Sequence, residues 1–369
     1  MHENNGGANA TKGFIHCLSV IFTDCTLICP VFEGMATDYI PDNVKVLSYE
    51  DHRSKIRKGL DCYRGIICAS YPYVKQHLND HRYEIIVIDH SFAGAGLTNV
   101  FKKAGAKLIT IHHNIERDYL RDNRKEHSIL YRIPYIYFAK KAERNMLTMS
   151  VLNLTLTEKD AVVFRSWPAH GVIHHWGTFD YRPIEEKNFL KRERGLSFVI
   201  TGSLCFIQSL QPIMEFIQRY WTILRKEYPN ATLKIAGRNP STELQKLCSN
   251  NTAITLISNP KDMTKIIQNA DYYICPINAG SGQKLRVMDG LKQGLPILCH
   301  EVSAAGYEQI AKAGCLFSYH DETSFKSALQ AMVHAQICPD KVYDTFRNCF
   351  SLEIGTERLR QILLQTNLL

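Results

Sequence analysis

The chain has 369 residues, of which 45% are hydrophobic and 22% charged, and its 44 basic and 36 acidic side chains give a net charge of +8. This length allows two domains, and this composition excludes a disordered chain. The moderate, dispersed positive charge fits an anionic small ligand or an anionic membrane surface, and the lack of a long cationic block argues against nucleic acid. No apolar run is long enough to predict a membrane span.

The cysteines and the first residues both indicate a cytoplasmic protein. The 12 cysteines form no CxxC pair and lie mostly in apolar runs, which predicts reduced, buried thiols rather than disulfides or zinc ligands. The polar start MHENNGGANATKG lacks the apolar core of a signal peptide. We therefore expect a cytoplasmic location.

Short apolar runs rich in β-branched residues alternate along the chain with longer amphipathic segments. The runs of the first half are residues 25–29, 45–49, 83–89, 106–111, 152–157 and 171–175. Those of the second half are residues 196–202, 231–237, 254–258, 271–277 and 296–300. Helical patterns lie between most neighbours, for example over 209–228 and 263–269. This alternation predicts an α/β protein with parallel sheets built from βαβ units.

Proline and charge interrupt the pattern near residues 180–186. We expect a Rossmann-like domain over 1–183, a second one over 184–345, and a helix over 346–369 that packs back on the first domain. A glycine loop that opens a first helix normally follows a strand, but only MHENN precedes Gly6 and Gly7. The first strand of the first domain is therefore expected to be missing, or this half to be built differently.

The run PINAGSGQKLRVMDG over 276–290 follows a buried-type strand and predicts a glycine-rich turn that opens a helix ended by Gly294. Backbone N–H groups and the helix dipole at such a turn attract anions, and Lys284 and Arg286 add positive charge in the first turn of the helix. Asp289 lies further along the helix, where a carboxylate can reach sugar hydroxyls beside a bound phosphate. A tight turn with solvent-facing cations is an equal alternative on these residues alone.

Residues 198–310 resemble the C-terminal half of glycosyltransferase family 4, the retaining sugar-nucleotide transferases of the GT-B fold. The resemblance rests on five pieces in matching order, FVITGSL, PIMEFI, YPNATLKIAGRNP, ITLISNPKDM and DYYICPINAGSGQKLRVMDGLKQGLPILCHEVSAAGYEQI. It implies two Rossmann-like domains whose parallel sheets face a central cleft. It also implies that the glycine turn holds the donor diphosphate and that the carboxylate on the following helix binds the donor ribose.

The resemblance implies a set of donor-binding residues in the second half. They are Gly202, Gly237, Gly280, Ser281, Gly282, Gln283, Lys284 and Arg286 near the diphosphate, Asp289 at the ribose, and Arg238 and Pro260 near the base. Lys284 and Asp289 are expected to take part in catalysis. No metal and no cofactor besides the sugar nucleotide are implied.

The first half resembles the family more weakly, although in the expected order. Gly6 and Gly7 match the glycine loop that approaches the diphosphate and the acceptor. The piece TIHHN places a histidine close to the reacting sugar, with His112 as the better match and His113 on the acceptor side as the second. Asp89 and His90 are expected to form an acceptor-side wall. Without the resemblance, a histidine at a strand end more often caps or packs.

The sequence also departs from the family. Ser203 and Gln208 stand where members often carry Arg and Lys, and Ser281 replaces the first of two glutamates. These changes leave more of the diphosphate charge to Lys284 and Arg286. They also leave an alternative hypothesis open, in which the protein is a degenerate member that binds a sugar nucleotide or a partner enzyme without turnover. A nucleotide-sugar epimerase of the same architecture would need further acid and base carboxylates, which the sequence does not identify.

The resemblance implies retaining transfer of a hexose from a UDP- or GDP-sugar to a lipid-linked glycan acceptor, in the synthesis of a cell-surface polysaccharide such as a capsule or exopolysaccharide. The segment 116–144 is rich in cations and tyrosines, and its piece ILYRIPYIYF suits the headgroup zone of an anionic membrane. These residues favour a helix pair packed on the first domain with a solvated face. Peripheral contact with the inner face of the cytoplasmic membrane is the alternative.

Overall fold

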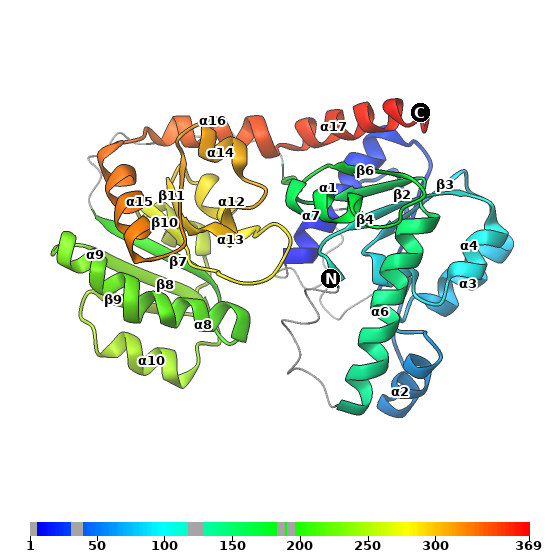
Figure 1. The fold of residues 1–369 in the computed structure, drawn as a ribbon, viewed down its shortest axis with the longest axis horizontal. Coiled ribbons are helices and arrows are strands. Elements are labelled where there is room, and N and C mark those ends of the chain that lie inside the picture. Colours follow the sequence, from blue (N-terminus) through cyan, green and yellow to red (C-terminus); the bar gives the residue numbers. More distant parts are fainter. Residues whose placement is uncertain (1–5, 31–39, 117–128, 183–188, 190–195) are drawn as a thin grey trace. The chain divides into compact units, whose positions relative to one another are not determined.

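The computed structural model describes residues 6–30, 40–116, 129–182, 189 and 196–369. The chain divides into two compact units. Figure 1 labels their helices and strands and colours them along the sequence, from blue to red. Unit 1 comprises residues 1–183, 280–283 and 352–369, and unit 2 comprises residues 184–279 and 284–351.

Unit 1 contains two parallel sheets. In the first sheet, β1 (Cys25–Pro30) pairs with β2 (Val44–Tyr49). The second sheet has the order β3 (Ile85–Asp89), β4 (Lys107–His112), β5 (Leu152–Thr155) and β6 (Val172–His175). The first helix, α1, begins at Gly6, which is also the first residue that the structure describes.

The helices of unit 1 begin and end at residues suited to those positions. They are α1 (Gly6–Ile21), α2 (Lys55–Tyr63), α3 (Tyr71–Asp80), the 3₁₀ turn η1 (Ser91–Gly94), α4 (Thr98–Ala104), α6 (Ile129–Met149), α7 (Glu158–Arg165) and α17 (Leu352–Gln365). The side chain of Ser54 accepts from the first turn of α2, and Thr157 does the same for α7. Gly105 ends α4 in the left-handed conformation, with φ 71°.

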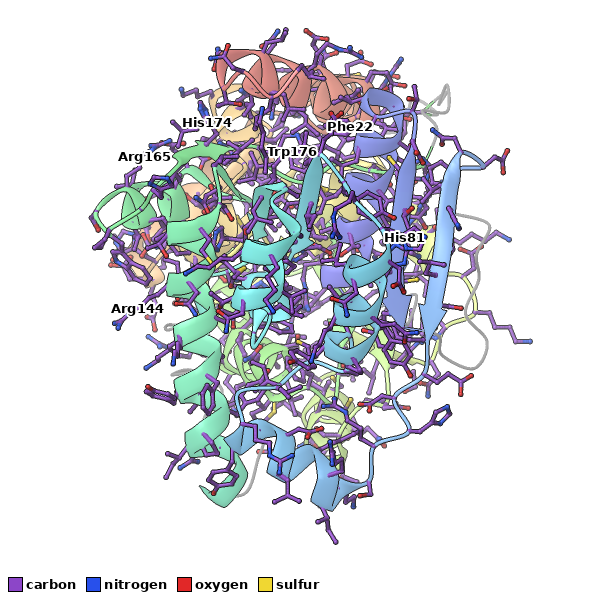
Figure 2. The ribbon with its side chains drawn as sticks, turned by 90° about the vertical axis from the view of Figure 1, so that its right-hand side faces the viewer. Phe22, His81, Arg144, Arg165, His174 and Trp176 are labelled. Atoms are coloured by element: carbon purple, nitrogen blue, oxygen red, sulfur yellow. The ribbon has the colours of Figure 1, made fainter. Side chains whose placement is uncertain are left out.

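The last helix, α17, completes the core of unit 1. Trp176 is fully buried and its Nε1 donates to the carbonyl of Gly355 at 2.9 Å, so that Trp176 lies beneath α17 in Figure 2. The ring of Phe179 lies against Gly355, where any added Cβ would overlap the ring. Glycine at this position therefore lets α17 pack closely against Phe179 and the rest of unit 1.

Gly355→Ala is expected to lower the free energy of unfolding by about 1–3 kcal/mol, because the new methyl group overlaps Phe179. Gly59→Ala in α2 is the matched control, since an added Cβ there meets no atom within 4 Å. That change should stabilise the protein by about 0.5–1 kcal/mol through helix propensity. Urea denaturation of both variants measures the difference. Equal stabilisation by both would contradict the close packing of α17.

Unit 2 is one parallel sheet in the order β12-β11-β10-β7-β8-β9. Its strands are β7 (Ser197–Ser203), β8 (Thr232–Arg238), β9 (Ile254–Ser258), β10 (Tyr272–Cys275), β11 (Ile297–His300) and β12 (Leu316–Tyr319). Phe198 and Ile200 of β7 pack into one core, and Val199 packs into the core on the other face. The chain order reverses between β7 and β10, which is where open α/β sheets bind ligands.

The helices of unit 2 cover both faces of this sheet. They are α8 (Ile207–Glu215), the π-helical η2 (Phe216–Tyr220), α9 (Trp221–Glu227), α10 (Thr242–Ser249), α11 (Met263–Gln268), α12 (Arg286–Leu291), α13 (Glu301–Ala304), α14 (Glu308–Lys312), α15 (Glu322–His334) and α16 (Pro339–Phe350). The helix predicted over 209–228 is thus interrupted by a π turn, and the predicted strands lie in parallel sheets.

Candidate active site

Four polar residues follow the ends of two neighbouring strands in unit 1. Asp89 and His112 end β3 and β4, and His90 and His113 come directly after them. The ring of His113 stacks on that of His90, with centroids 4.2 Å apart. His113 Nε2 lies 2.5 Å from Asp89 Oδ1. The parallel pairing of β3 with β4 therefore brings Asp89, His90 and His113 together.

The first helix contributes a further residue, Thr11, which the sequence analysis missed. Thr11 Oγ1 donates to Asp89 Oδ2 at 2.5 Å, so that both carboxylate oxygens of Asp89 are bonded. Burial raises the pKa of Asp89, but the His113 ring and Thr11 outweigh it and hold this pKa below 3.8. Asp89 is thus a fixed anion that orients the His113 imidazole. No local signal in the sequence indicates Thr11, because its partner Asp89 lies 78 residues away.

His112 has different surroundings from those expected. Its side chain is 1% exposed, its Nε2 lies 3.0 Å from Asn153 Oδ1, and its ring packs on Phe164 of α7. Burial lowers the pKa of His112 to about 4, which keeps the ring neutral. The structure therefore places His112 in the interior of the sheet and brings His113, not His112, to the carboxylate of Asp89.

This burial predicts a pH effect on stability. Because the folded His112 resists protonation and the unfolded one takes a proton below pH 6.5, His112 destabilises the protein as the pH falls from about 6.5 to about 4. His112→Gln is expected to remove about 2 kcal/mol of the stability lost between pH 7 and pH 5. Urea denaturation at both pH values tests this, and an unchanged pH dependence in the variant would contradict it.

Glu116 is a second residue that the sequence analysis did not single out for the site. Its side chain is buried, and Glu116 Oε1 lies 3.1 Å from His90 Nδ1. His90 has a positive φ of 75°, which is uncommon for a residue with a side chain. Burial, followed by the charge of His113, lowers the pKa of His90. Each histidine of the stacked pair thus has its own carboxylate partner, Asp89 for His113 and Glu116 for His90.

The glycine-rich turn over 280–283 belongs to unit 1. Gly280 and Gly282 have φ of 86° and 72°, which glycine adopts without strain. A Cβ on Gly282 would come within 2.5 Å of the His113 carbonyl oxygen and of Asn114 Oδ1. Thr178 Oγ1 donates to Gln283 Oε1 at 2.6 Å. The turn therefore lies directly against the backbone of His113.

The helix after this turn begins later than predicted. It was expected to include Lys284 in its first turn, but α12 starts at Arg286. The residues before it are held by another contact, because Tyr307 Oη donates to the carbonyl of Lys284 at 3.0 Å. Gly6 and Gly7 also differ from the prediction, since they form the first turn of α1 instead of a loop.

Arg286 is anchored at the carboxyl end of β7. Its Nη1 donates to the Thr201 carbonyl at 3.3 Å, and its Nη2 donates to Ser209 Oγ of α8 at 2.9 Å. Gly202 leaves the room for this guanidinium, because a Cβ there would come within 2.5 Å of Nη1. Ser209 and Thr201 are anchoring partners that the sequence did not indicate. The cation at the switch point of unit 2 is therefore held by backbone and side-chain acceptors.

Asp289 lies near the buried hydroxyl groups of Tyr273 and Thr201, next to Arg286. Tyr273 Oη lies 2.6 Å from Thr201 Oγ1, and both side chains are buried. Burial, followed by the negative charge of Asp289, raises the pKa of Tyr273 well above 10. Asp289, Tyr273 and Arg286 thus form one electrostatic group at the end of β7 and β10.

Three of the remaining predicted donor residues lie at or after strand ends in unit 2, and the fourth, Ser281, lies in unit 1. Gly237 packs against the carbonyl of Gly202, which leaves no space for a side chain at this position. Arg238 is exposed at the end of β8, and Pro260 follows β9. Ser281 is half-buried in the glycine turn of unit 1. The carboxyl ends of the neighbouring parallel strands β8 and β9 thus carry Gly237, Arg238 and Pro260.

Comparisons with known proteins agree with this architecture. Residues 197–335 match the family model described as "Glycosyl transferases group 1". No curated protein matches the sequence significantly. HepE from Anabaena, determined in complex with UDP, is 8% identical with a TM-score of 0.67, and the match covers 98% of this chain and 96% of HepE.

Two further solved structures are similar. Sucrose-phosphate synthase from Thermosynechococcus elongatus is 10% identical, with a TM-score of 0.66 over 98% of this chain and 93% of that one. The pneumococcal O-GlcNAc transferase GtfA, determined with UDP and GlcNAc, is 16% identical with a TM-score of 0.53 over 82% of this chain. This chain spans only 60% of the length of GtfA.

These similarities confirm the predicted GT-B fold, and the family match is confined to residues 197–335.

Proposed function

We propose that the protein transfers a hexose, with retention of configuration, from a UDP- or GDP-sugar to a glycan acceptor. The observation that carries this proposal is the anchored Arg286 at the switch point of a glycosyl transferases group 1 domain. A fixed guanidinium there suits a diphosphate, which Arg binds through charge-assisted hydrogen bonds. The UDP found in the structures of HepE and GtfA favours a UDP-linked donor.

In the proposed reaction, the bond from the anomeric carbon to the donor phosphate breaks and negative charge builds on the diphosphate. Arg286 and Lys284, with amides of the glycine turn, supply positive potential where this charge develops. Asp289 binds the ribose of the donor. Because Ser203 and Gln208 carry no charge, these two cations take most of the diphosphate charge.

His113 takes the role first assigned to His112 in this proposal. Its imidazole is oriented by Asp89, and its carbonyl lies against the Gly282 turn. A histidine so placed hydrogen-bonds the donor sugar and stabilises it as the bond to phosphate breaks. We assign Asp89, His90 and the rest of the N-terminal domain over 1–183 to the acceptor side, and the domain over 184–345 to the nucleotide.

A thermal-shift screen of UDP-, GDP- and ADP-sugars tests which donor binds. NMR of the product formed with water or an acceptor then determines the configuration of the transferred sugar. Stabilisation by one UDP- or GDP-sugar and release of the α-configured sugar from an α-linked donor are expected. A product of inverted configuration, or stabilisation by none of these donors, would refute the proposal. Stabilisation without turnover on any acceptor would instead favour a sugar-nucleotide-binding protein, the alternative that Ser203, Gln208 and Ser281 suggest.

We further propose that helices α2 and α6 of unit 1 contact a membrane, and that the acceptor is lipid-linked, such as one used in the synthesis of a cell-surface polysaccharide. Helices α2 and α6 are in contact, since Gly65 after α2 lies against Phe138 of α6. The exposed apolar side chains of these helices are Ile56 (78%), Leu60 (53%), Tyr63 (59%), Ile133 (63%) and Tyr137 (59%). Exposed Lys and Arg flank them, at Lys55, Arg57, Arg64, Lys141 and Arg144. No helix among the described residues is long and apolar enough to cross a membrane.

Apolar side chains flanked by cations suit the interface of an anionic membrane. Part of the segment expected to touch the membrane, residues 117–128, lies outside the described residues. Ile56→Ser is expected to reduce flotation with vesicles of phosphatidylcholine and phosphatidylglycerol by several-fold, and high salt should reduce it further. Val162→Ser is the matched control, because Val162 is 58% exposed on α7. Equal losses in both variants would refute this surface.

A further inference from the structure

A cavity of about 470 Å³ lies in unit 1, beyond the end of β2. This volume is within the range of small-molecule sites, roughly 300–1,000 Å³. Most of its polar wall comes from the piece EDHRS, which directly follows β2, and the rest from Arg57 in the first turn of α2. Ala69, with Pro72 and Tyr73 of α3, completes the wall. The cavity therefore lies where a parallel strand ends, as ligand sites of α/β sheets do.

Two arginines of this wall are fixed by one buried carboxylate. The side chain of Asp61 in α2 is 5% exposed, and its two oxygens lie 3.0 Å from Arg57 Nε and 3.5 Å from Arg53 Nη1. Arg53 also donates from Nε and Nη2 to the two oxygens of Asp51, at 2.8 Å and 3.2 Å. A guanidinium has five N–H donors, so that both arginines keep donors for a ligand. The wall thus contains donors whose positions are set before a ligand binds.

Carboxylates lie beside these donors. Glu50 Oε2 lies 3.2 Å from His52 Nε2, and Asp51 Oδ2 lies 3.2 Å from Lys58 Nζ. Hydrogen bonds from Arg53, followed by one from Lys58, lower the pKa of Asp51 to about 2 and keep it ionised. The two arginines and Lys58 equal the three carboxylates of this group in number. The wall therefore offers donors and acceptors side by side with no net charge.

This balance of charge determines which ligand fits. A phosphate or carboxylate does not suit the wall, because its cations already have carboxylate partners and Glu50 and Asp51 repel an anion. The neighbouring hydroxyl groups of a sugar both donate and accept. They can therefore bond to a guanidinium and a carboxylate at the same time.

Tyr73 adds an aromatic face to the cavity. Its ring stacks on that of Tyr49 with centroids 4.8 Å apart, and its Oη donates to the carbonyl of Glu50 at 3.1 Å. Tyr73 is nevertheless 39% exposed. An aromatic ring that is fixed on one side and open on the other can pack against the C–H face of a pyranose.

The cavity lies close to the histidines of the candidate active site. Cys68 directly precedes a wall residue, and its Sγ donates to the carbonyl of Phe92 at 3.3 Å. The ring of Phe92 packs on that of His90, with centroids 4.5 Å apart. Burial raises the pKa of Cys68 to about 12, and the charges of Arg53 and Glu116 then shift it in opposite directions. One layer of side chains thus separates the cavity from the His90–Glu116 pair.

We propose that this cavity binds a neutral sugar of the acceptor other than the sugar that reacts, so that the acceptor is an oligosaccharide and not a monosaccharide. The proposal rests on the proposed function, because it names the class of acceptor. The two arginines donate to hydroxyl groups of this sugar, Glu50 and Asp51 accept from them, and Tyr73 covers one face of its ring. The reacting sugar of the same acceptor lies beside His90.

The first measurement is binding of glycans to the full chain without any sugar nucleotide. An array of neutral, phosphorylated and carboxylated oligosaccharides selects the probe, and calorimetry gives its Kd. Neutral oligosaccharides are expected to be retained. They should also bind more tightly than the monosaccharides that compose them, because two parts of one ligand are held at once.

Variants of the wall then test the cavity itself. Glu50→Gln and Tyr73→Leu are each expected to raise the Kd of the selected oligosaccharide by about tenfold, the effect of losing a hydrogen bond to a charged group or the packing on a ring. Glu158→Gln is the matched control, because Glu158 of α7 is also an exposed carboxylate and bonds to Arg165. It should leave this Kd within about twofold.

Three results would overturn the proposal: retention of no neutral oligosaccharide, an affinity no higher than that of the monosaccharides, or equal Kd values in Glu50→Gln and Glu158→Gln. Retention of anionic glycans alone, with loss at high salt, would replace it with an anion site. Glycan binding in a protein that no sugar nucleotide stabilises would refute the proposed transfer and not this site. Turnover of a sugar nucleotide without glycan binding would have the opposite meaning.

Discussion

His113→Ala is expected to lower kcat for sugar transfer by about 100-fold to 10,000-fold, the range typical of a catalytic side chain that acts by proton transfer or hydrogen bonding. The Kd of the sugar nucleotide should change by less than about threefold, since His113 is assigned to the reacting sugar and not to the diphosphate. Kinetics with an excess of donor, together with calorimetry of UDP binding, separate the two quantities.

The same measurements on His112→Gln decide between the two histidines. Because His112 is bonded to Asn153 inside the sheet, its replacement should change stability with pH more than it changes kcat. Asp89→Asn should lower kcat less than His113→Ala does, because the amide keeps the shape of the carboxylate but not its charge. A large loss of kcat in His112→Gln with none in His113→Ala would restore the first assignment.

Arg286→Ala is expected to weaken binding of UDP by about 10- to 100-fold, the effect of losing a charge-assisted hydrogen bond to phosphate. The loss of affinity should exceed the loss caused by removing a distant cation, because Thr201 and Ser209 hold Arg286 rigidly. Binding of uridine, which lacks the diphosphate, should change much less. Isothermal titration with both ligands measures this difference.

Arg219→Ala is the matched control for Arg286→Ala. Arg219 also lies in unit 2, but its guanidinium bonds to Glu215 and Glu322 on the surface. Its removal changes the net charge by the same amount and should leave the Kd of UDP within about twofold, because exposed charges are screened by salt. Equal weakening by both variants would mean that net charge, and not the anchored Arg286, determines binding.

The parallel sheets were predictable from the sequence because buried strands of β-branched residues have a strong and local signal. The run LFSY of β12 was missed, since it is short and contains a serine. The helix over 209–228 was predicted as continuous, and its interruption at 216–220 has no local signal in FIQRY. The start of α12 was placed too early, because Gln, Lys and Leu all favour helices and the turn is fixed by contacts distant in sequence.

The candidate site was predictable only in part. Strand ends indicated Asp89 and the His112–His113 pair. In β4, however, all residues after Lys107 are buried, so alternation of side chains does not say which histidine meets Asp89. Thr11 and Ser209 could not be selected, because their partners are 78 and 77 residues away in sequence. Such pairings follow from strand order, which a single sequence does not specify.

The position of α17 has a consequence for synthesis of the protein. Cys17 of α1 donates to the carbonyl of Leu352, 335 residues later, and Trp176 is covered by a residue 179 positions downstream. The first unit to leave the ribosome is therefore the last to close, and its apolar surface stays uncovered while unit 2 is translated. We expect nascent chains that stop before residue 352 to bind chaperones and resist native purification, however complete their second unit is.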